Sequence, residues 1–600
     1  MKNINGLPNR IIKNIQTFMF QWIMFFLAIL LFACHSDQSS KKNAGLPPET
    51  ENTLYIYTLK GTDTQSSYDE AMAVACIQGI MNREKERLYV KSNTAKRPDY
   101  WFDKFSTEGW LAEKVQTPVA TLNELVALAG KQLKGAIIWD TSVPATVNLA
   151  TTLAGLEDGI VLSPDFAETY LSEWKLPVIK DFRGQFTGAE TGSKKNDAYR
   201  WAIREYIGVG KCNPHWLCLY EDAYMTRYKG DVSYVVTRDW AVYNRAFVYD
   251  LSPWGDEAPL DDPNQTLGVD LQTYKLMLEA NLKLTDGKQM TEVTGFFSFP
   301  KYSNIPGYPH KHEPVPTEWE TVWLISPYNC YQNTAASDCY NQSVHSKFKI
   351  ANMSQGRPAL RQPQEGKTYI CILMADYDSA TPLYDFMPTH WDDPERGKLP
   401  LLWGINPSLS ETFPDIMEYF YRTKSANDWF AADASAAGYM NPNRIAPEYL
   451  PLFVEHNKKF YSRWDMSLSP MVLDWDEPTA AVKDAFLQFS PDGFSTIVID
   501  FHDNGGKLPV PQVWKGMPVT ELINDACNFA SAEEAASLIS RTISAPKSKT
   551  PTYYFYRIIW TSPKSVIQTI DLLKKLRPEL DIEVVDAYNF YHFFKTTHSK

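Results

Sequence analysis

The sequence predicts an α/β protein in which an N-terminal α/β region precedes a C-terminal (β/α) barrel of seven or eight strands. Two observations predict this class. The first is a strand–helix–strand pattern at 52–90 that recurs at 136–162. The second is a series of short apolar runs, beginning at residue 368, that alternate with helical or irregular segments. The chain is also long enough, at 600 residues and 44% hydrophobic, to bury more than one core.

The N-terminus is expected to be a lipoprotein signal peptide, residues 1–33. Basic residues precede an apolar run at 18–32, which is short for a membrane-spanning helix and is followed by polar residues. The sequence Leu31-Phe32-Ala33-Cys34 resembles the lipobox of bacterial lipoproteins, which implies cleavage before Cys34 and acylation of its thiol. We therefore expect an exported lipoprotein, periplasmic or outer-membrane associated in a Gram-negative bacterium, that touches the membrane through this lipid only. The alternative is a single anchor helix with an incidental cysteine.

After a linker at 34–52, the N-terminal α/β region is expected to cover 53–355. An S-x-x-E capping box at Ser67 and Glu70 is predicted to begin its first helix. The predicted strands are 52–59, 88–90, 136–139 and 159–162, and the predicted helices cover 72–81 and 146–153. Pro-containing stretches at 250–266 and 300–316 are predicted loops. The pairs Cys212/Cys218 and Cys330/Cys339 are candidate short-loop disulfides in an exported protein.

The C-terminal region is expected to cover 360–600, after a polar, Pro- and Gly-containing stretch at 355–366. The runs predicted as strands are 368–375, 399–405, 429–432, 467–473, 496–499, 553–559 and 582–585. Polar residues follow almost all of them. In parallel barrels and open α/β sheets the active site lies at the carboxyl ends of the strands, so these residues are expected to converge. The alternative is that each Asp or Asn caps the next helix.

A family resemblance covers nearly all of the chain after the linker. The segment Ala436-Ala437-Gly438-Tyr439-Met440-Asn441-Pro442 resembles the motif that names the GxGYxYP family, with Ala436 in place of the first Gly and Asn441 in place of the second Tyr. Asp376-Tyr377-Asp378 and the stretch 402–407 also resemble family segments. So do four N-terminal stretches, 77–83, 238–240, 261–263 and 318–320. The family is classed with the glycoside hydrolases, so the resemblance implies that activity.

Glycoside hydrolysis needs two carboxyl groups, one as acid and the other as base or nucleophile. The candidate catalytic residues are Asp376, Asp378, Asp433 and Asp503, without an assignment of acid against base. The candidate substrate-binding residues are Trp403, Asn406, Tyr439, Trp475, Asp500, His502 and Arg557. Each aromatic ring among them could stack on a sugar or simply pack. A glycan is the expected partner, and no cofactor and no metal are expected.

Two other functions stay open. An Asp-x-Asp at a strand end, with His390 and His502, could hold a divalent metal, as in barrel polysaccharide deacetylases. An aromatic-rich lipoprotein could also bind a glycan without cutting it. Nucleic acid is not an expected partner, because the net charge is −12 and phosphate-backbone binders are generally basic.

Overall fold

The computed structural model is a mixed α/β protein with parallel sheets, and residues 49–600 form one compact unit. The residues that it describes are 50–60, 65–92, 100–224, 235, 237–297, 301, 312, 314–334, 339–474, 476–498, 510–523, 531–545 and 549–599. The predicted signal peptide, Cys34 and most of the linker lie outside them. Among the described helices, none has the length and hydropathy needed to cross a bilayer.

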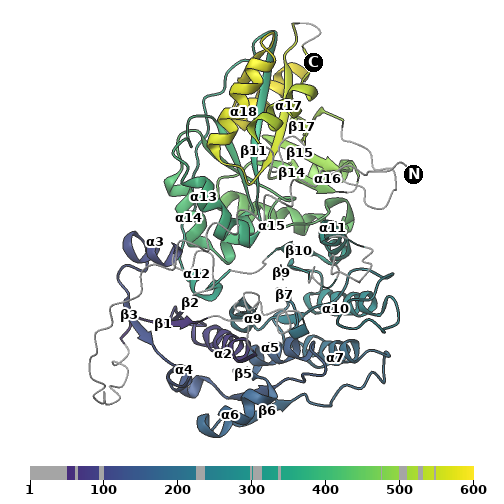
Figure 1. The fold of residues 1–600 in the computed structure, drawn as a ribbon. Coiled ribbons are helices and arrows are strands. Elements are labelled where there is room, and N and C mark those ends of the chain that lie inside the picture. The colour runs from purple at the N-terminus through teal and green to yellow at the C-terminus, as the bar shows by residue number, and fades with distance from the viewer. Residues whose placement is uncertain are drawn as a thin grey trace, which may run out of the picture. The chain divides into compact units, whose positions relative to one another are not determined.

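The first N-terminal sheet confirms the first strand–helix–strand step (Figure 1). Strand β1 (Thr53–Leu59) pairs in parallel with β2 (Leu88–Ser92) and with β3 (Val115–Val119). Helix α2 (Gln65–Met81) connects β1 to β2 and buries its apolar residues from Ala71 to Met81. The predicted capping box is wrong, because α2 begins two residues before Ser67 and so contains both Ser67 and Glu70.

Two more parallel sheets complete the N-terminal region. One has the order β5-β4-β6, and α5 (Thr146–Glu157) connects β4 to β5 as predicted. The other has the order β10-β9-β7-β8. Their strands are β4 (Gly135–Ile138), β5 (Gly159–Leu162), β6 (Val178–Asp181), β7 (Trp216–Leu219), β8 (Phe247–Tyr249), β9 (Thr291–Gly295) and β10 (Cys330–Asn333).

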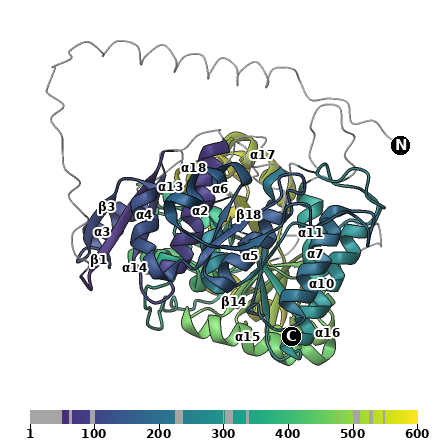
Figure 2. The same ribbon diagram turned by 90° about the horizontal axis from the view of Figure 1, so that it is seen from below.

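The remaining N-terminal helices cover these sheets. Helices α7 and α10 lie side by side in both ribbon views (Figures 1 and 2). The helices are α3 (Tyr100–Glu108), α4 (Leu122–Ala129), α6 (Pro164–Trp174), α7 (Lys194–Ala202), α9 (Arg238–Asn244), α10 (Val269–Thr285), α11 (Pro314–Ile325) and α12 (Gln342–His345). The predicted loop at 250–266 contains no helix or strand. Most of the other predicted loop, 300–316, lies outside the described residues, and α11 begins within it at Pro314.

The C-terminal region contains all seven predicted strands. Five form a parallel sheet of order β13-β12-β11-β18, in which β19 also pairs with β11. These are β11 (Lys367–Tyr377), β12 (Leu401–Ile405), β13 (Asp428–Ala432), β18 (Thr552–Ile559) and β19 (Asp581–Val584). A second sheet has the order β14-β15-β17-β16. Its strands are β14 (Leu468–Asp474), β15 (Gly493–Val498), β16 (Gln512–Trp514) and β17 (Met517–Glu521), and the antiparallel β16–β17 hairpin was not predicted.

The predicted barrel is not confirmed. The strand pairing of the described residues divides the C-terminal strands into two sheets instead of closing one. The sheets are linked by an isolated parallel bridge between Ile523 and Tyr556 and by a hydrogen bond of 2.9 Å from Ser435 N to Met471 O. The helices of this region are α13 (Met387–Trp391), α14 (Pro414–Thr423), α15 (Leu450–Arg463), α16 (Ala480–Phe486), α17 (Ala532–Thr542), α18 (Pro563–Leu576) and α19 (Ala587–His598).

The N-terminal and C-terminal regions share a core. The indole of Trp101, in α3, donates a hydrogen bond of 2.7 Å to Tyr384 O. Asp415, in α14, accepts hydrogen bonds from Trp110 Nε1 at 3.0 Å and pairs with His345 Nδ1 at 2.8 Å. All these groups are buried or half-buried, so separating the two regions would expose polar partners as well as apolar surface.

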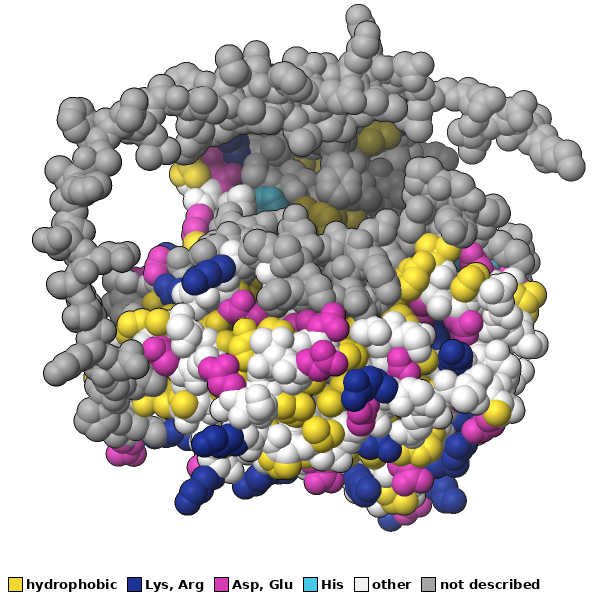
Figure 3. All heavy atoms as spheres, turned by 60° about the horizontal axis from the view of Figure 1, so that its bottom comes forward, with side chains coloured by type: hydrophobic (Ala, Val, Ile, Leu, Met, Phe, Trp, Pro, Cys, Tyr) yellow, Lys and Arg dark blue, Asp and Glu magenta, His cyan; other side chains and the backbone are white. Residues whose placement is uncertain are grey.

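The predicted disulfides are wrong. Cys212, Cys218, Cys330 and Cys339 are free thiols, as are Cys76 and Cys371. All six are buried, and burial is the environment in which a free cysteine acts as a small apolar residue. On the face of the molecule in Figure 3, acidic and basic side chains alternate with hydrophobic ones, as on an ordinary solvated surface.

Candidate active site

The carboxyl end of β11 carries two of the predicted catalytic residues. Asp376 has a φ of 65°, in the left-handed region, so the backbone turns sharply as the strand ends. Trp560 Nε1 donates a hydrogen bond of 2.9 Å to Asp376 O and holds that turn. Asp376, Asp378 and Ser379 are half-buried, so the turn presents side chains to solvent at the strand end.

Asp433 lies immediately after β13 and is fully buried. Its Oδ2 accepts a hydrogen bond of 3.1 Å from Asp376 N, and its Oδ1 accepts one of 3.1 Å from Ala434 N. Gly404, in β12 between the two, provides the space: a Cβ there would lie 2.3 Å from Asp433 Oδ2. Asp433 therefore holds the Asp376 turn from a buried position behind the strand ends.

Arg557, in β18, forms an ion pair with Asp376. Because β18 pairs with β11, the guanidinium group lies beside the strand end that carries the carboxylates. The side chains of Arg557 and Asp376 are 14% and 24% exposed, so the pair remains accessible to a ligand. The structure thus brings together Asp376, Asp378, Asp433 and Arg557; their roles stay predictions.

Sequence reasoning did not assign a role to Glu318, in α11, which joins this cluster from the N-terminal region. Its carboxyl group interacts electrostatically with Asp376, Asp378 and Arg557. The signal available was that 318–320 resembles a segment of the GxGYxYP family. That resemblance marked the stretch without placing it near the strand ends.

The environment raises the pKa of three of these carboxyl groups. Burial, and then the negative charge of Asp376, raises the pKa of Asp433 to about 7. The same two causes raise the pKa of Glu318 to about 7. Burial and the charges of Asp433, Asp376 and Glu318 raise the pKa of Asp378 well above its ordinary value. The site therefore holds protonated carboxyl groups near neutral pH beside the Asp376–Arg557 pair.

The motif loop at 436–442 lies beside this cluster, because the hydroxyl of Tyr439 interacts electrostatically with Asp378 and Arg557. Tyr439 exchanges two backbone hydrogen bonds with Gln332, in β10, at 2.8 and 2.9 Å. Gly438 has a φ of 104°, and a Cβ there would lie 2.1 Å from the ring of Tyr331. Ala436, at the motif's first Gly position, has a φ of 98°, which is a conformation that suits glycine.

The other predicted substrate-binding residues that the structure describes differ in position: Tyr439 lies near the carboxyl groups, whereas Trp403 and Asn406 are held by packing and hydrogen bonds. Trp403 is fully buried and its indole donates a hydrogen bond of 2.9 Å to Asp428 Oδ1, so it packs and offers no face to a sugar. Asn406 caps the short helix at 407–411 and donates a hydrogen bond of 2.6 Å to Asn333 Oδ1. Tyr439 is largely buried. Four further predicted residues lie outside the described residues: Trp475, Asp500, His502 and Asp503.

Among the residues that the structure describes, no group of three or more His, Cys, Asp or Glu side chains has the geometry to hold a metal ion. His390, considered for such a site, forms a hydrogen bond of 2.7 Å between its Nδ1 and the hydroxyl of Tyr377.

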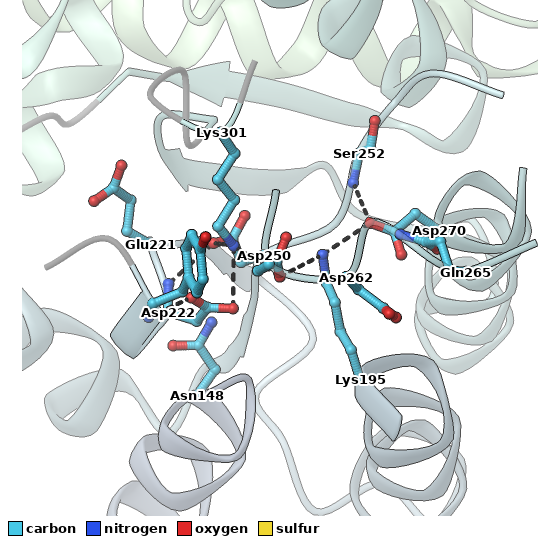
Figure 4. Close-up of polar contacts among 12 residues, drawn as sticks. Asn148, Lys195, Glu221, Asp222, Asp250, Ser252, Asp262, Gln265, Asp270 and Lys301 are labelled. Carbon is cyan, nitrogen blue, oxygen red and sulfur yellow. Dashed lines mark hydrogen bonds and ion pairs between the residues drawn. The ribbon is translucent and has the colours of Figure 1, made fainter. Parts of the chain in front are cut away.

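A second charged cluster lies in the N-terminal region, at the carboxyl ends of β7 and β8 (Figure 4). Lys301 Nζ lies 3.1 Å from Asp222, 2.6 Å from Asp250 and 3.1 Å from Asp261. Lys195, in α7, lies 3.0 Å from Asp261 and bridges it to Asp270, in α10. All these side chains are buried, so the cluster joins α7, α10 and the loop at 250–266 and is closed to a ligand.

Known protein families match both the N-terminal and the C-terminal region of the chain. Residues 366–595 match the domain described as "GxGYxYP putative glycoside hydrolase C-terminal domain", and residues 133–208 match the "GxGYxYP_N second domain". Together the two matches cover about half of the chain. A solved structure described as a putative hydrolase from Bacteroides thetaiotaomicron VPI-5482 is similar in fold, with a TM-score of 0.66 at 15% identity over 91% of this chain and 95% of that one. No curated protein matches the sequence.

Proposed function

This chain belongs to the GxGYxYP family, and from that premise we propose that it is a glycoside hydrolase that cuts a complex glycan with carboxyl groups at its strand ends. The observation that carries the proposal is the group formed by Asp376, Asp378, Asp433 and Arg557. Three strands of one sheet bring these four side chains together, and Asp376 and Asp378 keep contact with solvent.

The geometry supports a division of labour between the carboxyl groups. Asp376, paired with Arg557, is the carboxylate that acts as base or nucleophile at the anomeric carbon. A neighbouring carboxyl group with a raised pKa supplies the proton that the leaving oxygen needs. Asp433 is a positioning residue, because it holds the Asp376 backbone through the hydrogen bond from Asp376 N. The reaction needs only water as co-substrate.

We also propose that the protein acts outside the cytoplasm as a lipoprotein. The support is the sequence alone: the apolar run at 18–32 and the lipobox-like residues before Cys34. Radiolabelled palmitate incorporated into the wild type but not into a Cys34→Ala variant is the expected result, and equal labelling of both would refute it.

The activity is tested with a soluble form that starts after Cys34, incubated with a broad glycan panel in the presence and absence of a chelator. Release of reducing sugar that survives the chelator is the expected result. Release of acetate, or activity that the chelator abolishes, would instead indicate the metal-dependent deacetylase alternative. Binding of a glycan without any product would indicate a capture protein and would contradict the proposal for the glycans tested.

A further inference from the structure

We propose that a cation-lined cavity in the N-terminal region is a binding site for an acidic sugar, one that carries a carboxylate or a sulfate group. The cavity has a volume of about 480 Å³, which lies within the range of about 300–1,000 Å³ typical of small-molecule sites. The lining residues that carry the argument are Arg83, Lys211, Asn213, Tyr243, Asn244 and Arg245. None of them belongs to the carboxyl cluster at the C-terminal strand ends, so the inference is independent of the proposed glycosidase activity.

The cavity lies at the amino ends of two neighbouring strands. Strands β7 and β8 pair in parallel, so the segments that lead into them share one edge of the sheet. Residues 211–213 precede β7, and residues 243–245 end α9 and precede β8. Arg83, just beyond the end of α2, completes the lining. Catalytic sites of α/β sheets lie at the carboxyl edge instead, so the cavity is assigned to binding and not to catalysis.

Arg83 is the fixed part of the lining. Its guanidinium group forms an ion pair with Asp158 and donates hydrogen bonds of 2.6 Å to Gly155 O and 3.0 Å to Val242 O. These two carbonyl groups lie near the carboxyl ends of α5 and α9, where a positive charge is favourable. Neutralising the helix ends therefore accounts for Arg83 without a ligand.

That explanation does not extend to the other two cations. Lys211 and Arg245 are exposed, and among the described residues neither forms an ion pair with a carboxylate. Lys211 Nζ lies 6.0 Å from the ring centre of Tyr206, which is a distant cation–π contact. No Asp or Glu of the described part of the chain lines the cavity, although the net charge of the protein is −12. The cavity thus presents positive charge that its own lining does not neutralise.

Two of the positive groups are close enough to repel each other. Burial lowers the pKa of Arg83, and the positive charge of Arg245 lowers it further, whereas Asp158 raises it. Asp158 offsets only one of the three cations in the lining. A bound anion beside Arg245 would reduce the repulsion between the two guanidinium groups, and a guanidinium group matches the geometry of a carboxylate or a sulfate.

The uncharged lining residues favour a sugar over a bare ion. Asn213 Oδ1 accepts a hydrogen bond of 3.1 Å from His215 N. Asn244 Nδ2 donates one of 3.0 Å to Trp240 O. Within the described contacts, the Nδ2 group of Asn213 and the Oδ1 atom of Asn244 are left to a ligand, and sugar hydroxyls can both donate and accept. The half-buried ring of Tyr243, stacked on Trp240 at 5.5 Å between centroids, adds apolar surface.

The test measures the binding of glucuronate, glucose 6-sulfate, glucose and inorganic sulfate by isothermal titration calorimetry. The protein is the soluble form that starts after Cys34, which contains the whole compact unit 49–600. We expect the two acidic sugars to bind and to compete with each other, and their affinity to fall as salt is added. Glucose and inorganic sulfate should each bind at least about 10-fold more weakly, because each lacks part of the recognised groups.

The variants assign the binding to the cavity. The double variant Lys211→Gln/Arg245→Gln is expected to weaken the binding of both acidic sugars by about 10-fold or more. Arg245→Lys keeps the charge and should lose less than the double variant. Lys175→Gln is the matched control, since Lys175 is also an exposed cation at a helix C-cap, with a φ of 53° against 55° for Arg245, and lies outside the lining. Its affinities should equal those of the wild type.

Each outcome decides the inference. Failure of both acidic sugars to bind, or equal binding by the wild type and the double variant, would overturn it. Inorganic sulfate that binds as tightly as the acidic sugars would show an ion site only, and glucose that binds as tightly would show that charge is not recognised; both overturn the assignment. Urea unfolding checks the fold, and Lys211→Gln alone, an exposed change outside helices and strands, replaces the double variant if that variant unfolds. A wild type that cleaves no glycan would overturn the proposed function and leave this inference standing.

Discussion

The substitution Gly404→Ala tests whether Asp433 positions the catalytic turn. Gly404 lies in β12, in an ordinary strand conformation, so alanine suits its backbone. The new methyl group would lie 2.3 Å from Asp433 Oδ2 and 2.7 Å from Asp433 Cγ. Ordinary contacts begin near 3.4 Å, so the carboxylate must move by about 1 Å.

That displacement has a calculable effect on activity. The carboxylate that moves is the one that accepts the hydrogen bond from Asp376 N at 3.1 Å, so the strand-end turn loses its support. Misplacement of a reacting group by about 1 Å can cost about 10²-fold in rate. Overpacking of a well-packed site typically costs about 1–3 kcal/mol of stability, which a chain of this size can tolerate. We therefore expect a folded enzyme with kcat/KM reduced about 10²-fold.

The assay is kcat/KM for the soluble form on whichever glycan it cleaves, with unfolding in urea as a check on the fold. Gly155→Ala is a matched control. Gly155 lies in α5, where its new methyl group would lie 3.2 Å from Val242 O, away from the strand ends that carry the carboxyl groups. The kcat/KM of this variant should be unchanged. A folded Gly404→Ala variant with wild-type kcat/KM would refute the positioning role of Asp433.

Four other predictions concern stability. Ala436→Gly is expected to raise the free energy of unfolding by about 1 kcal/mol, because the strain of alanine at φ 98° exceeds the entropic cost of glycine, and a lower urea midpoint would contradict this. Lys301→Met is expected to lower the free energy of unfolding by about 3–5 kcal/mol, since it leaves the buried Asp222 and Asp250 without an ammonium partner and Asp261 with Lys195 alone; a loss below about 1 kcal/mol would show that the buried pairs matter little. Burial raises the pKa of Asp222 to about 7, so protonation of Asp222 stabilises the fold fully below about pH 4, and this stabilisation is lost as the pH rises towards 7. In Asp222→Asn the free energy of unfolding should no longer fall over this pH range, and an unchanged pH dependence of unfolding would contradict the prediction. Added dithiothreitol should leave the unfolding midpoint of the soluble form unchanged, because the six described cysteines are free thiols.

Much of the C-terminal fold could be predicted because its signals are local. Apolar runs of four to eight residues are expected for strands buried in a parallel sheet. Because parallel strands end at the same edge of a sheet, the polar residues directly after these runs, such as Asp376 and Asp433, lie together at that edge. The β16–β17 hairpin was missed although Lys515-Gly516 carried a signal. Both residues have positive φ, which is typical of a two-residue hairpin turn.

The rest depended on tertiary contacts that periodicity does not encode. Trp403 and a ring exposed for stacking look alike in sequence, and only the hydrogen bond to Asp428 shows that this indole packs. Glu318 lies in a helix that begins at Pro314, in a stretch predicted as loop, and its neighbours in the site are distant in sequence. The barrel was inferred from strand count and spacing, which do not determine how the strands pair.

The central claim is that the carboxylates at the strand ends carry out hydrolysis. The most direct measurement is sugar release from the glycan panel by the wild type and by the Asp376→Asn/Asp378→Asn double variant, with glycan binding measured for both. The account predicts that the wild type releases sugar, and that the folded double variant binds the same glycan but releases none above background. Equal release by both proteins would contradict the account.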